Sequence, residues 1–158
     1  MNIALVAHDS RKKELCEWVE YNKQTLFHHK LYATGTTAKL LNEIVVKNDS
    51  SGEVTQDWYE MPLLVTALLS GPLGGDQQIG AMIAQGQIDV LIFFCDNLIQ
   101  QGHQNDVSAL TRLASLYNIA FATNRTTADM ILTSPLFKDP EYKRIIPEAI
   151  NNYKNRTL

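Results

Sequence analysis

Five short apolar runs, each followed by a polar turn and a helical pattern, restrict most strongly how this chain can fold. They lie at Ile3–Ala7, Lys30–Ala33, Leu63–Leu69, Ile88–Phe94 and Asn118–Ala122. Runs of this length and composition are typical of buried strands, whereas the segments between them carry apolar residues at spacings of three and four. Strands that alternate with helices form a parallel sheet with helices on both faces. The sequence therefore predicts a three-layer, doubly wound α/β fold of Rossmann or flavodoxin type. It has a mainly five-stranded parallel sheet, with residues 1–158 as one domain.

Three local features qualify this outline. The segment Asn48–Asp57 is polar, which indicates an exposed loop. Asp9 or Ser10 is expected to cap the first helix, and Lys12 in its first turn opposes the helix macrodipole unless an anion is bound. A last helix is expected near residues 141–153.

Composition excludes several classes of function. The net charge of −3 argues against a general nucleic-acid binder, because such proteins need a basic surface. No apolar run approaches the length of a membrane span, and Met1 leads directly into the first strand without a leader pattern, so we expect a cytoplasmic protein without a membrane partner. Neither the two cysteines nor the histidines show the spacing of a metal site.

The turn at residues 70–78, Ser-Gly-Pro-Leu-Gly-Gly-Asp-Gln-Gln, joins the third apolar run to a helix. Its glycines let the backbone approach a ligand, and its N–H groups favour an anion. Asp76 in this turn is either a helix cap or a chemical base, and the turn alone favours the cap. Ligands of parallel α/β sheets bind at the carboxyl ends of the strands. Other polar residues follow the predicted strands there: His8, Asp9, Thr34–Thr37, Asp96, His103 and Thr123–Asn124.

These residues divide into two chemical groups. One group suits a phosphate: Lys12, Thr34, Thr36, Thr37, Ser70 and the backbone of Gly35 and Gly71. The other can move protons: His8, Asp76, Asp96, His103 and Asp106. The sequence has no nucleophile elbow, Walker motif or dinucleotide fingerprint. The combination favours a small phosphorylated carbonyl compound from which a carboxylate removes a carbon-bound proton, while neutral histidine donates to the enediolate oxygen.

Four segments together resemble the methylglyoxal synthase family. They are residues 3–9, 31–37, 69–78 and 88–94, and the Gly-Gly-Asp-Gln-Gln string at 74–78 is the most specific of the shared motifs. The resemblance covers nearly the whole chain. It implies conversion of dihydroxyacetone phosphate to methylglyoxal and inorganic phosphate, by a homohexamer that uses neither a metal nor an organic cofactor.

Matching positions imply a role for each site residue. Asp76 is expected to be the base, and His8 and His103 to polarise the substrate oxygens. The phosphate is expected to be held by Lys12, Thr34, Gly35, Thr36, Thr37, Ser70 and Gly71. Asp9, Asp96 and Asp106 are expected in orienting or electrostatic roles around the base and histidines. Arg156 is expected to reach the phosphate site of a neighbouring subunit.

Two segments depart from the family pattern. The connection at residues 48–58 is longer than expected, and is either an inert surface loop or a change in subunit packing. The loop at residues 97–105 lacks the prolines expected around His103, which leaves it less pre-organised.

Two other functions fit the same fold class. The first is a non-catalytic, ligand-binding regulatory domain, against which Asp76 and the two histidines argue because a pure binder needs no base. The second is a phospho-accepting signalling domain, which should carry an acidic pair after the first strand and an acceptor aspartate directly after the third. His8–Asp9 and the turn at residues 70–76 occupy those places instead.

Overall fold

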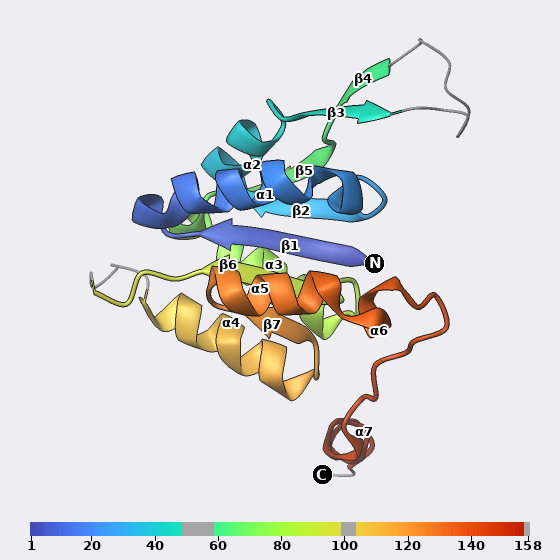
Figure 1. The fold of residues 1–158 in the computed structure, drawn as a ribbon. Helices are drawn as coiled ribbons and strands as arrows, with labels where there is room; N and C mark the ends of the chain where they lie inside the picture. Colours follow the sequence, from blue (N-terminus) through green and yellow to red (C-terminus); the bar gives the residue numbers. More distant parts are fainter. Residues whose placement is uncertain (49–58, 99–103, 157–158) are drawn as a thin grey trace.

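A computed structural model describes residues 1–48, 59–98 and 104–156 of the chain. Its centre is a five-stranded sheet in which every neighbouring pair of strands is parallel (Figure 1). In spatial order the strands are β5 (Val65–Leu68), β2 (Lys30–Thr34), β1 (Asn2–Ala7), β6 (Val90–Phe94) and β7 (Ala120–Ala122). All five predicted strands are confirmed, although β5, β6 and β7 begin two residues later than the apolar runs do.

Helices cover both faces of this sheet. The helices are α1 (Lys12–Leu26), α2 (Gly35–Leu41), α3 (Gly75–Ala84), α4 (Gln104–Leu116), α5 (Arg125–Thr133), α6 (Pro135–Lys138) and α7 (Glu148–Lys154). Apolar side chains of α1, α2 and α5 join one buried cluster, and those of α3 and α4 join the other. No helix in these described ranges is long and apolar enough to cross a membrane.

The two clusters explain why the central strands β1 and β6 are almost entirely apolar. Successive side chains of a strand point to opposite faces, so Leu5 enters the cluster that contains Trp18, whereas Val6 enters the cluster that contains Ile79. Because both faces are covered, all residues of β6 and all of β1 except Asn2 are buried.

The strand order identifies where the chain changes direction. The chain builds β1, β2 and β5 outwards on one side, then returns to place β6 and β7 on the other side of β1. The first and fourth parallel strands along the chain, β1 and β6, therefore flank the switch point, as in Rossmann-type sheets. Signalling domains with a flavodoxin-type sheet place the first strand between the second and third, so this order argues against that alternative.

A second, antiparallel sheet was missed by the sequence analysis. It pairs β3 (Val45–Asn48) with β4 (Tyr59–Pro62), and Val46 faces Met61 across the pair. The expected loop lies outside the described residues except for its first residue, Asn48, which ends β3. Two apolar residues followed by Lys47 and Asn48 give too short a pattern to predict a strand.

Two predictions about helix ends are wrong. A single 3₁₀ turn, η1 (Asp9–Arg11), precedes α1, and no side chain caps either element. Asp9 and Ser10 use their side chains elsewhere: the Asp9 carboxylate accepts from Lys12, and the Ser10 hydroxyl donates to Asp96. The last helix begins at Glu148, not near residue 141, because Pro147 cannot lie inside a helix without removing a backbone hydrogen bond.

Candidate active site

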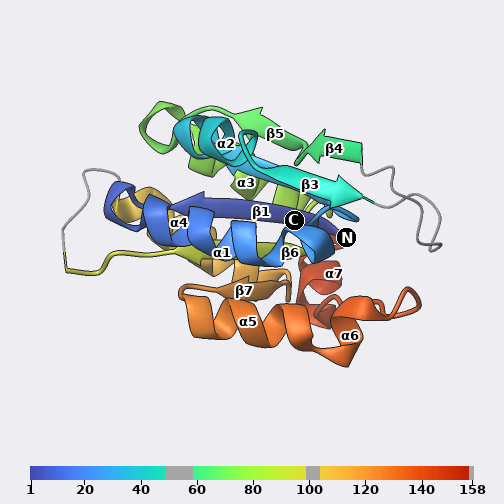
Figure 2. The ribbon, with the colours of Figure 1, turned by 45° about the horizontal axis from the view of Figure 1, so that its top comes forward.

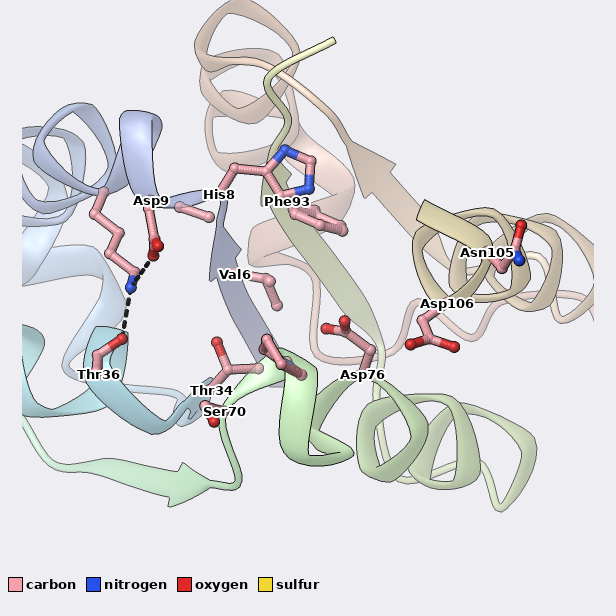
Figure 3. Close-up of a pocket in the computed structure, with 14 residues that line it drawn as sticks. Val6, His8, Asp9, Thr34, Thr36, Ser70, Asp76, Phe93, Asn105 and Asp106 are labelled. Atoms are coloured by element: carbon pink, nitrogen blue, oxygen red, sulfur yellow. Dashed lines mark hydrogen bonds and ion pairs between the residues drawn. The ribbon is translucent and has the colours of Figure 1, made fainter. Parts of the chain in front are cut away.

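A cavity of about 800 Å³ opens beside the switch point, at the carboxyl ends of the strands (Figure 3). Nine residues from the predicted site line it: His8, Asp9, Lys12, Thr34, Thr36, Ser70, Gly71, Asp76 and Asp106. They come from the ends of β1 and β2, the turn after β5, and the first turns of α1 to α4. The expectation that these polar residues gather at one edge of the sheet is confirmed for this set.

The glycine turn fixes the position of Asp76. A second 3₁₀ turn, η2 (Gly71–Leu73), ends at Gly74, whose φ of 103° lies in the left-handed region that favours glycine. The N–H of Gly75 donates to the Ser70 carbonyl at 3.0 Å, and a Cβ on Gly75 would stand 2.0 Å from the Leu69 oxygen. Asp76 is the second residue of α3 and is not its cap, because Gly74 holds the cap position. Its side chain is 3% exposed and faces the cavity from the same side as Asp106 (Figure 3).

His8 lies between the two sides of the cavity, in the first position after β1 (Figure 3). Its backbone N–H continues the sheet ladder to the Phe94 carbonyl at 3.2 Å, and its ring packs edge-on against Phe93 with centroids 5.0 Å apart. The backbone N–H of Asp96 donates to Nδ1 of His8 at 2.8 Å. A ring nitrogen that accepts a hydrogen bond carries no proton, so neutral His8 has its proton on the buried Nε2.

The opposite side of the cavity carries the predicted phosphate residues. Nζ of Lys12 lies 2.5 Å from the Asp9 carboxylate and 2.5 Å from the Thr36 hydroxyl (Figure 3). Asp9 thus supplies the negative charge near the start of α1 that the sequence analysis expected only from a bound anion. The N–H of Gly35 donates to the Leu69 carbonyl at 3.2 Å, which joins the start of α2 to the segment that carries Ser70.

Some predicted residues do not line the cavity. Asp96 is held behind His8, and Gly35 and the fully buried Thr37 lie behind the lining. Arg156 is exposed and its guanidinium lies 3.7 Å from the centre of the Tyr153 ring. Figure 1 and Figure 2 show α7, which precedes it, on the side of the sheet where the strands begin, opposite to their carboxyl ends. His103 lies outside the described residues.

Five lining residues were missed: Val6, Ala7, Pro72, Phe93 and Asn105. Val6 and Phe93 are partners in the register of β1 and β6, so their side chains share one face at the ends of neighbouring strands. The alternation of side chains along each strand, which places Val6 and Phe93 on one face, could have been predicted from the sequence. Asn105 directly precedes Asp106 in the first turn of α4, and no sequence pattern marked it.

One thiol lies next to the site. Cys95 follows β6, and burial raises the pKa of its thiol to about 11, partly opposed by the positive charge of Arg11. The thiol therefore stays protonated near neutral pH and is a poor nucleophile. Within residues 1–48, 59–98 and 104–156, no three His, Cys, Asp or Glu side chains are grouped so as to hold a metal ion.

Comparison with known proteins identifies the family of the chain. A family model described as an MGS-like domain matches residues 14–123. The methylglyoxal synthase of Proteus mirabilis is 49% identical over 155 residues, which cover 94% of this chain and 91% of that protein. That of Erwinia tasmaniensis is 50% identical over 147 residues, covering 93% and 86%. The crystal structure of methylglyoxal synthase from Elizabethkingia anophelis matches with a TM-score of 0.80 and 43% identity, covering 99% of this chain and 91% of that one. On the family match, the identity and the shared fold, this chain belongs to the methylglyoxal synthase family.

Proposed function

We propose that this protein is a carbon–oxygen lyase that converts dihydroxyacetone phosphate to methylglyoxal and inorganic phosphate through an enediol(ate) phosphate. The observation that carries this proposal is the pairing of two groups across one cavity. The buried carboxylate of Asp76 and the buried ring of His8 face an ammonium and hydroxyl groups suited to a phosphate. The curated relatives supply the name of the activity.

The first step assigned to Asp76 is proton removal. Its carboxylate takes a proton from the hydroxymethyl carbon next to the substrate carbonyl, and the C–H electrons move into the carbonyl to form an enediolate. A positioned base of this kind contributes about 10²–10⁴-fold in rate. The Nε2–H of neutral His8 donates to the oxygen where charge develops, and His103 shares this role as the resemblance implies.

The second step expels the phosphate. The terminal hydroxyl gives its proton to the leaving phosphate while its electrons form a new aldehyde C=O. The C=C bond moves to the phosphate-bearing carbon as the C–O bond to the phosphate breaks, and the resulting enolate takes a proton on its CH2 carbon to give methylglyoxal. The C–O bond breaks readily only when it stands perpendicular to the enediolate plane, where it overlaps the π system. The groups that anchor the phosphate at Lys12, Thr34, Thr36 and Ser70 therefore control which reaction follows, because they set this orientation.

Charge arrangement around the phosphate supports the division of labour. Lys12 is held between Asp9 and Thr36, so its ammonium is already oriented before a ligand arrives. Asp106 stands beside Asp76 on the other side of the cavity, where it orients the base or relays a proton. Asp96 acts on His8 through its backbone N–H. These roles extend the assignments made by resemblance to Asp9, Asp96 and Asp106.

The assembly and location are part of the proposal. Arg156 contacts Tyr153 of α7, a helix that lies opposite to the carboxyl ends of the strands (Figure 1), so we assign it to the phosphate site of a neighbouring subunit. This is consistent with the expected homohexamer, in which each site is completed by a second chain. The protein is expected to act in the cytoplasm on a diffusible phosphorylated substrate.

A turnover assay tests the proposal against the regulatory-domain alternative. Purified protein is incubated with dihydroxyacetone phosphate, the dicarbonyl product is trapped with an aromatic ortho-diamine, and phosphate release is measured in parallel. Equal amounts of methylglyoxal and phosphate, far above the enzyme concentration, are expected. Binding of the substrate without turnover would instead favour the regulatory domain.

A further inference from the structure

The hydroxyl of Ser10 makes a contact that the proposed mechanism does not use. Ser10 lies in η1, directly after β1, and its Oγ donates to Oδ2 of Asp96 at 2.5 Å. Asp96 follows β6, the neighbouring strand. The bond therefore connects the two segments that leave the sheet on either side of the switch point.

A second bond between the same two segments closes a ring. The backbone N–H of Asp96 donates at 2.8 Å to Nδ1 of His8, which lies two residues before Ser10. The other carboxylate oxygen of Asp96, Oδ1, accepts from the backbone N–H of Leu98 at 2.9 Å. Each carboxylate oxygen of Asp96 thus accepts a hydrogen bond from a group outside the His8 ring, while its backbone N–H donates to Nδ1.

This arrangement decides which nitrogen of His8 carries the proton. A carboxylate facing Nδ1 would accept from it, which favours a proton on Nδ1 and stabilises the doubly protonated ring. A backbone N–H facing Nδ1 does the reverse and leaves the proton on Nε2. We propose that Ser10 is a positioning residue that keeps the Asp96 carboxylate turned away from His8, and so maintains the Nε2–H form that donates to the substrate oxygen. Its catalytic consequence depends on the proposed function, but its effect on His8 does not.

The exposed position of Ser10 allows its effect on His8 to be tested separately from any effect on folding. Its side chain is exposed and fills no core space, so an alanine removes one hydrogen bond without leaving a buried cavity. Ser108, in α4, offers a matched control, because its exposed hydroxyl donates at 3.1 Å to the Gln104 carbonyl of its own helix. Ser10→Ala and Ser108→Ala thus remove the same atom at similar exposure, and only the first contacts Asp96.

The test reads the His8 tautomer directly by nitrogen-15 NMR of the histidine rings, with the His8 signals assigned by their loss in His8→Gln. Wild type and Ser108→Ala are expected to show the Nε2–H form, and Ser10→Ala an increased share of rings protonated at Nδ1. Steady-state assays are expected to show kcat lowered by about 3- to 10-fold in Ser10→Ala with KM changed less than about twofold. Ser10→Thr, which keeps a hydroxyl, restores both readouts.

The two failures are distinguishable. A Ser10→Ala variant that keeps the wild-type tautomer overturns the positioning role, whatever its activity. If the tautomer shifts as expected but the wild-type protein forms no methylglyoxal, the proposed function falls and the effect of Ser10 on His8 stands.

Discussion

Replacing Gly75 by alanine tests whether the glycine turn fixes the position of Asp76. An added Cβ would stand 2.0 Å from the Leu69 oxygen and 2.9 Å from its carbonyl carbon, both of which are backbone atoms. Relieving the contact needs a shift of about 1 Å, since real Cβ atoms essentially never approach other atoms within 3.0 Å. Overpacking of this kind costs about 1–3 kcal/mol of folding free energy.

The effect on activity should exceed the effect on stability. The Leu69 carbonyl accepts a hydrogen bond from the N–H of Gly35, at the start of α2. Its displacement therefore disturbs the residues proposed to hold the phosphate as well as Asp76, which directly follows the substituted Gly75. A catalytic group misplaced by about 1 Å costs about 10²-fold in rate. We therefore expect kcat/KM for dihydroxyacetone phosphate to fall at least about 10²-fold in Gly75→Ala, while urea denaturation still shows a cooperatively folded protein.

Gly80→Ala is the matched control within the same helix. Its added Cβ meets only the tip of the Leu113 side chain, at 3.0 Å, which can rotate away, and alanine favours the helix over glycine. We expect near-native activity and unchanged or higher stability. Near-native turnover in Gly75→Ala, with the protein folded, would refute the reasoning that this turn sets the geometry of the base.

Three further predictions follow from single residues. Lys12→Met should raise KM by about 10-fold and weaken inhibition by inorganic phosphate, because its ammonium is already held at Thr36 on the phosphate side; unchanged inhibition would contradict this. Arg156→Ala should weaken phosphate binding in the assembled protein, measured by KM and phosphate inhibition, and equal values in both proteins would remove the intersubunit role. Burial raises the pKa of Cys95 to about 11, so its alkylation, followed by mass spectrometry, should be slow at neutral pH and accelerate as pH rises towards that value; fast alkylation at neutral pH would count against it.

The fold was predictable where pattern and position agreed. Strands β1 and β6 are buried on both faces, so their runs of apolar residues stood out without an alternating pattern. The β3–β4 pair was not predictable, because its strands are short and are separated by ten residues without the two-residue turn sequence that is typical of a hairpin. Likewise, Ser10 is of a residue type that often caps helices, but its hydroxyl instead donates to Asp96, which lies 86 residues further along the chain.

The site was predictable in its residue types more than in its contacts. Strand ends brought His8, Thr34 and Asp76 to one edge, since parallel strands place their carboxyl ends together. The tautomer of His8 depends on a backbone N–H from another strand end, which no sequence pattern reveals. The distance of Arg156 from the cavity depends on how the last segment folds back, and Arg144 holds that segment against the Ile88 carbonyl at 2.7 Å, just before β6.

The measurement that tests the central claim most directly is methylglyoxal formation by Asp76→Asn. The amide has the same shape as the carboxylate but cannot take the carbon-bound proton, so the fold and the phosphate side are expected to persist. We expect turnover to fall by about 10²–10⁴-fold while inorganic phosphate still binds with nearly wild-type affinity. Methylglyoxal formation at a near-native rate by the purified variant would show that Asp76 is not the base.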